Sequence, residues 1–180
     1  MDHSDLKRQA VFYLGLCELV ETRLAIRAEY TSAVKALDAA WSWIEHKDVS
    51  GKTLNDLILD EEGYGIGAPM SVESDRTLWH AWGCVSDAMT FTALAAYDSE
   101  GAAAMPENVS LVNTPESRNG FADSFRALVP VESVLERFAA ELDAMPDGSL
   151  VRSDVRNCAF STLHSAAMAQ ALRNNVNTAV

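Results

Sequence analysis

Apolar residues recur at helical spacing along most of the chain. From about Asp5 to Tyr30 they return every three or four residues and so occupy one side of an α-helix. These positions are Leu6, Ala10, Tyr13, Cys17, Val20 and Leu24. The stretch from Ser32 to Lys47 repeats the pattern. Because apolar and polar positions do not alternate over any stretch of strand length, the sequence predicts an all-α fold.

The region near residues 75–97 carries apolar positions on two sides of a helix. One set is Leu78, Trp82, Val85, Met89 and Ala93, and the other is Cys84, Ala88, Phe91 and Ala95. A helix that is apolar on two sides belongs inside a protein rather than on its surface. We therefore predict that this helix, which would start at Ser74 or Asp75, is the centre of a helical bundle.

Shorter stretches complete the predicted bundle. Their apolar spacing indicates helices at about 53–59, 121–128, 131–142 and 153–173. Long loops are expected near 48–75, apart from the short helix within it, and near 98–117, because both segments contain glycine and proline. At 180 residues the chain suits one domain, residues 1–180, of about six or seven helices.

Most of the net negative charge of the chain lies in these two predicted loops. The net charge is −12; residues 48–75 contain seven acidic residues and one basic residue, and residues 98–117 contain four acidic residues and no basic residue. The two segments therefore hold a net −10, and the helices are nearly neutral. Acidic loops with interspersed apolar residues are typical of a surface that steers a basic partner. A solvated loop that favours solubility is an equally good interpretation.

The sequence leaves the arrangement of the two loops open. They flank the predicted central helix, which is about 33 Å long. They form one acidic patch only if a loop folds back along the bundle. Two separate acidic ends are equally consistent with the sequence.

The charge and the cysteines narrow the class of partner and the compartment. Phosphate repels a strongly acidic chain, which argues against nucleic acid and anionic membrane surfaces as partners. No apolar stretch approaches the roughly 20 residues of a membrane span. The start, MDHSDLKRQA, does not look like a secretion signal. Cys17, Cys84 and Cys158 are an odd number in apolar stretches, as expected of free thiols, so we expect a cytoplasmic protein.

Residues that could bind a metal do not form a recognisable motif. No two of the four histidines lie three or four residues apart, and none follows a glutamate at the spacing of helical di-iron sites. Glu18 and Glu21 place two carboxylates on one helix face. A magnesium site would need a second pair, which we do not find, so we interpret these two residues as part of a solvated face.

Candidate catalytic patterns are equally weak. Gly63–Gly67 superficially resembles a phosphate-binding loop, but it lacks the Lys-Ser/Thr pair of a P-loop and follows three acidic residues. No serine lies in a nucleophile elbow, and no cysteine has a neighbouring histidine or lysine. The sequence therefore predicts no catalytic residue, no metal site, no cofactor and no enzymatic activity.

The general plan of the chain resembles that of a known group of proteins. It combines Trp41-Ser42-Trp43 late in the second predicted helix with a glycine-rich acidic loop and an alanine-rich end. In these features it resembles the all-α immunity proteins of bacterial polymorphic toxin systems, above all the family numbered six. The resemblance implies a protein that binds a cognate toxin and blocks it. Because such families diversify their contact surfaces, no contact residue is carried over.

Our main hypothesis is an immunity protein whose acidic surface meets a basic toxin domain. Asp60, Glu61 and Glu62 would steer the partner, and Tyr64 and Trp43 would anchor it. Two alternatives remain. One is a metal-dependent hydrolase whose carboxylates converge only in three dimensions, and the other is a helical regulatory module that self-associates. A homodimer is also compatible with the main hypothesis.

Overall fold

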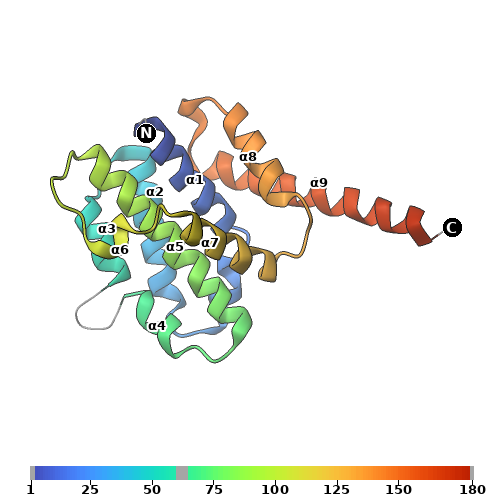
Figure 1. Ribbon diagram of the computed structural model, residues 1–180, viewed down its shortest axis with the longest axis horizontal. Helices are drawn as coiled ribbons and strands as arrows, with labels where there is room; N and C mark the ends of the chain where they lie inside the picture. Colours follow the sequence, from blue (N-terminus) through green and yellow to red (C-terminus); the bar gives the residue numbers. More distant parts are fainter. Residues whose placement is uncertain (1–2, 60–64, 179–180) are drawn as a thin grey trace.

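The computed structural model describes residues 3–59 and 65–178 (Figure 1). Over these ranges the chain forms nine α-helices and two 3-10 helices, and it forms no β-strand. In chain order they are α1 (His3–Cys17), η1 (Glu21–Ile26), α2 (Tyr30–His46), α3 (Gly51–Ile58), α4 (Gly67–Val72), α5 (Arg76–Ser99), α6 (Glu107–Ser110), α7 (Pro115–Leu128), α8 (Val134–Ala144), η2 (Asp147–Ser149) and α9 (Arg152–Thr178). The predicted all-α fold is confirmed, with a few more helices than expected.

The central position of α5 is also confirmed. Asp75 caps the helix, because its Oδ1 accepts hydrogen bonds from the backbone N–H groups of Thr77 and Leu78 at 2.8 and 3.1 Å. Both predicted apolar sides are buried, with Trp82 and Cys84 fully enclosed. Figure 1 shows α5 in the middle of the bundle, in contact with α1, α2, α3 and α7, whereas α8 and α9 pack on α1.

Aromatic side chains join the helices on one side of α5. The ring of Tyr13 on α1 stacks on Phe91 of α5 with centroids 3.9 Å apart, and it meets the edge of Phe121 on α7 at 4.6 Å. Next to it, Phe12 stacks on Phe138 of α8 at 5.6 Å. Aromatic pairs of this kind contribute about 0.5–1.5 kcal/mol each beyond their buried area. The core therefore extends from α5 through α1 to α8.

The prediction of one helix from Asp5 to Tyr30 is wrong. The α-helix ends at Cys17, where the backbone tightens: the N–H groups of Leu19 and Val20 bond the carbonyls three residues earlier, at 3.1 and 3.0 Å. A 3-10 helix then follows. The tighter turn changes the direction of the side chains that follow Cys17. As a result, the side chains of Glu18 and Glu21 lie in the interior.

The two segments predicted as loops also contain more helix than expected. The first holds the short helix predicted there, which is α3, and in addition α4; the second holds α6 and the start of α7. Local capping explains two of these helices. Ser50 Oγ accepts the N–H of Thr53 at 3.1 Å, and Thr114 Oγ1 accepts that of Ser117 at 3.2 Å, just before Pro115 at the first helical position. Short helices with few apolar residues are difficult to recognise from periodicity.

The half-buried Asp87 on α5 should make stability depend on pH. Burial raises the pKa of its carboxyl group from 3.8 to about 7, so the folded chain holds this proton to a higher pH than the unfolded chain does. The stabilising contribution is present below pH 4 and is lost as the pH rises to about 7. The stability advantage of Asp87→Asn over wild type should therefore grow as the pH rises from 5.5 to 8. The expected growth is about 1 kcal/mol in the free energy of unfolding, or about 3 °C in Tm.

Thermal unfolding at the two pH values, both above the sequence pI of 4.6, measures this gain. Asp123→Asn is the matched control, because its side chain is 79% exposed on α7. An Asp87→Asn advantage of the same size at both pH values would argue against the raised pKa.

Candidate functional site

The two acidic segments lie side by side in the fold. Asn108 of α6 donates a hydrogen bond to Asn55 Oδ1 of α3 at 2.8 Å. The carboxylate of Glu100, after α5, accepts the backbone N–H of Gly51 at 2.7 Å. Figure 1 shows α3 and α6 next to each other at one side of the bundle. Helices α3 and α6, one from each segment, therefore form one surface, because the chain after α5 folds back along α3.

Glycine at position 51 allows α3 to approach α5 closely. A Cβ atom at this position would lie 2.8 Å from Cγ of the Tyr97 ring, which is too close for any side chain. The start of α3 therefore lies flat on Tyr97, near the end of α5. This contact and the Glu100 carboxylate place α3 and the second acidic segment at the C-terminal end of the central helix, whereas Asp75 of the first segment caps its N-terminal end.

Exposed acidic and apolar side chains share this surface. We define the α3–α6 face by its exposed residues Asp56, Leu59, Glu100, Glu107 and Leu111. The two leucines are 53% and 55% exposed. Lys52 pairs with Asp56 at 2.6 Å, one turn away on α3. The face thus combines negative charge with apolar area, a combination suited to binding a basic surface.

Four of the five predicted contact residues, Asp60, Glu61, Glu62 and Tyr64, lie outside the described residues. The described residues on either side of this segment are attached to α3. The N–H of Leu59 bonds the carbonyl of Asn55 at 3.0 Å, and that of Ile66 bonds the carbonyl of Leu57 at 3.1 Å. Both flanking residues, Leu59 and Ile66, therefore lie at the C-terminal end of α3.

Trp43, the fifth predicted contact residue, is part of the core. Only 3% of it is exposed, and its neighbour Trp41 is equally buried at 2%. A buried indole cannot serve as a surface anchor, so the expectation for Trp43 does not agree with the structure. The Trp-Ser-Trp pattern on α2 reflects packing on both sides of the helix.

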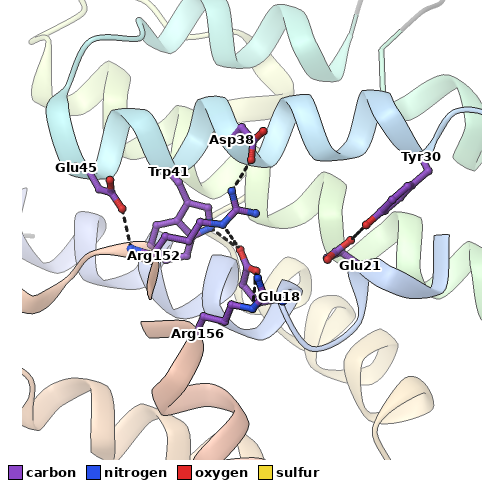
Figure 2. A network of polar contacts seen from close by, with 8 residues as sticks. All are labelled: Glu18, Glu21, Tyr30, Asp38, Trp41, Glu45, Arg152 and Arg156. Atoms are coloured by element: carbon purple, nitrogen blue, oxygen red, sulfur yellow. Dashed lines mark hydrogen bonds and ion pairs between the residues drawn. The ribbon is translucent and has the colours of Figure 1, made fainter. Parts of the chain in front are cut away.

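A second group of polar residues is buried where α1, α2 and α9 meet (Figure 2). Glu18, at the turn after α1, is 1% exposed. Its Oε1 accepts hydrogen bonds from Trp41 Nε1 at 2.9 Å and from Arg152 Nε at 2.7 Å. Its Oε2 lies 3.7 Å from Nε of Arg156. The interpretation of Glu18 as a solvated residue is wrong, because arginines from a distant part of the chain cover it.

Further acids hold Arg152 in place. Its guanidinium bonds Asp38 as well as Glu18, and its backbone N–H donates to Glu45 Oε1 at 2.7 Å (Figure 2). Nearby, the 7% exposed Glu21 accepts the hydroxyl of Tyr30 at 2.6 Å, and this hydrogen bond raises the pKa of Tyr30 to about 12. The network fixes the start of α9 against α1 and α2.

Reactive groups elsewhere in the described chain are not assembled for catalysis. Burial raises the pKa of the thiols of Cys17 and Cys84, so they stay protonated and unreactive. His80 Nδ1 lies 3.2 Å from Ser124 Oγ, but Ser124 is only 8% exposed. Within residues 3–59 and 65–178, no three His, Cys, Asp or Glu side chains are grouped as metal ligands.

Comparison with known families identifies the class of protein. The model of the family described as immunity protein Imm6 matches residues 8–128, about two thirds of the chain. The chain belongs to the Imm6 family of immunity proteins. The resemblance seen in the sequence is therefore confirmed. Searches of curated proteins and of solved structures find no match. Membership of an immunity-protein family indicates an inhibitor rather than an enzyme, in agreement with the prediction.

The Imm6 match divides the structure into a matched N-terminal region and an unmatched C-terminal region. It covers the helices from α1 to α7 and therefore contains the whole α3–α6 face. Helices α8 and α9 lie outside the match. The buried Glu18 belongs to the Imm6 region, whereas its partners Arg152 and Arg156 do not. In the described part of the chain, no helix is both long enough and apolar enough to cross a membrane.

Proposed function

We propose that the chain binds a cognate bacterial toxin and neutralises it, with the α3–α6 face meeting a basic surface of the toxin domain. Membership of the Imm6 family supports the role of inhibitor. The observation that supports the choice of surface is the hydrogen bond between Asn55 and Asn108, which holds α3 of the first acidic segment beside α6 of the second. The free thiols of the chain suit a reducing cytoplasm, where we propose that neutralisation takes place.

Charge and apolar area have different tasks in this proposal. The carboxylates Asp56, Glu100 and Glu107 attract a basic partner over a distance and accelerate its association. Leu59 and Leu111 are then buried by the partner, and because each is about half exposed beforehand, each contributes roughly 0.8–1.6 kcal/mol if fully covered. The adjacent Asp60–Glu62 run and Tyr64 remain proposed contacts of the same surface.

Charge reversal on the α3–α6 face should weaken toxin binding. The probe is the purified toxin domain encoded beside the gene of this chain. For the variant Asp56→Lys/Glu107→Lys we expect Kd to rise at least tenfold, about 1.4 kcal/mol. Most of the change should come from slower association, because reversed charges at the rim of an interface repel a basic partner during the encounter. Kinetic binding measurements at 50 and 300 mM salt test both expectations.

Asp123→Lys/Asp154→Lys is the matched control. It changes the net charge by the same amount at exposed positions on α7 and α9. Its Kd should stay within about twofold of wild type, because long-range effects of net charge are screened beyond roughly 8 Å at physiological salt. Equal weakening by both variants would refute the choice of surface, and no binding by wild type would refute the proposed partner.

A further inference from the structure

The exposed side of α9 carries large apolar side chains. Phe160, Met168 and Leu172 are 45%, 54% and 63% exposed. They are separated by eight and four residues, so they follow one another along the same side of the helix. Ala167 and Ala171 are exposed beside them. Figure 1 shows the second half of α9 extending beyond α8, away from the bundle around α5.

The same part of α9 has no charged residue of its own, although Arg156, one turn earlier, places its guanidinium carbon 5.7 Å from the centre of the Phe160 ring. Residues 157–172 contain no Asp, Glu, Lys or Arg, and no other run without these residues in the chain is as long. The next longest runs include 77–86 and 88–97 on α5, where burial in the core explains them. Burial does not explain the run on α9, because most of its residues are exposed. An exposed, apolar and uncharged helix face marks an interaction site.

We propose that this face of α9, defined by Phe160, Ala167, Met168, Ala171 and Leu172, is where two copies of the chain associate. Each copy carries a net charge of −12, of which the two acidic segments hold −10, so contacts between copies through the α3–α6 face bring acidic surfaces together. The α9 face avoids this repulsion. A basic partner, in contrast, is attracted to the acidic surfaces of the chain and gains no electrostatic energy on α9. Charge therefore favours a second copy as the occupant.

The shape of the face also suits a symmetric pair. A two-fold axis across α9 would bring the same residues of each copy together, and the exposed alanines allow two helices to approach closely. The helix is held firmly for this purpose. Arg152 and Arg156 fix its start at Glu18, and Gln170 Oε1 accepts the backbone N–H of Glu132 at 2.9 Å near its far end. Because α9 is already ordered, little conformational entropy is lost on association.

Sedimentation equilibrium of the full chain, from about 5 to 200 μM, tests the proposal. Wild type should approach twice the monomer mass of 19.6 kDa as its concentration rises. Met168→Glu/Leu172→Glu should raise the dimer Kd at least tenfold. Ile26→Glu/Val72→Glu is the matched control, because both residues are apolar and more than 70% exposed, and they lie far from α9 in sequence. The control should dimerise with a Kd within about threefold of wild type, and circular dichroism should show all variants folded.

Three results would overturn the inference. One is a wild-type mass of 19.6 kDa at every concentration. Another is equal weakening by the two glutamate variants, which would indicate general charge repulsion. The third is a monomeric wild type whose binding to the toxin domain is lost in Met168→Glu/Leu172→Glu, since that would assign the face to the toxin. If a variant unfolds, the thermal midpoint of wild type decides, because for a dimer it rises with protein concentration.

Discussion

Replacing Arg152 with alanine should lower the free energy of unfolding by about 3 kcal/mol, the largest effect that we expect from removing a single polar side chain. The reason is the carboxylate that remains. Glu18 is 1% exposed, and it would lose the hydrogen bond at 2.7 Å that Arg152 donates. Arg156 cannot fully replace it from 3.7 Å. Because the side chain of Arg152 is itself 30% exposed, the value lies at the lower end of the range for buried pairs.

Chemical denaturation of the variant measures this loss, and Arg173→Ala is its control. Arg173 lies on the same helix and pairs with Glu132 at 3.4 Å, but both side chains are at least half exposed. Surface pairs of this kind contribute at most about 1 kcal/mol. Similar losses in the two variants would show that Glu18 is not held in a low-dielectric environment.

A second substitution separates the charge from the packing. In Glu18→Gln/Arg152→Ala no buried carboxylate is left unpaired, and the amide can still accept the hydrogen bond from Trp41. We expect this double variant to recover at least 1 kcal/mol relative to Arg152→Ala. Hydrogen exchange should locate the loss, with faster exchange in α8 and α9 and little change in α5, because the arginines connect α9 to the Imm6 region.

The same network shows where sequence reasoning reaches its limit. The pattern on α5 was sufficient to predict a central helix that starts at Ser74 or Asp75, because these signals are local, and the structure places the cap at Asp75. The burial of Glu18 depends on its hydrogen bond with Arg152, which is 134 residues away in the sequence. A glutamate in an apolar run, after Cys17 and before Leu19, was the available signal for burial. Without its partner in view, the more common solvated interpretation prevailed.

The acidic surface was predicted in part for a similar reason. Composition located the net negative charge in two segments, but only contacts made in the fold, those of Asn108 with Asn55 and of Glu100 with Gly51, bring α6 and α3 together. The helical spacing of Trp41 and Trp43 could not distinguish a core residue from an exposed anchor, since α2 is buried on both sides. The family, in contrast, was accessible from the overall plan of the chain, because fold class and charge are properties of the whole sequence.

Replacing Gly15 with alanine should destabilise the protein by about 2 kcal/mol, although alanine is the better helix former. A Cβ atom at this position in α1 would lie 2.6 Å from Phe138 Cζ on α8 and 2.7 Å from Val155 Cγ1 on α9. Both contacts are far inside the normal limit, so the side chains of Phe138 and Val155, or the helices that carry them, must move away from α1. Gly15 is therefore the residue that allows these two helices to pack on the Imm6 region.

Gly120→Ala is the control, because no atom lies within 4 Å of the corresponding Cβ position on α7. That variant should be stabilised by about 0.5–1 kcal/mol through the higher helix propensity of alanine. A double-mutant cycle then tests the proposed clash. Phe138→Leu is destabilising alone, but it removes the ring atoms that meet the new methyl group. The loss in Gly15→Ala/Phe138→Leu should thus be at least 0.5 kcal/mol smaller than the sum of the single losses. Additive losses would mean that α8 accommodates the new methyl group without a loss of stability. The close approach to Gly15 would then not hold the C-terminal helices in place.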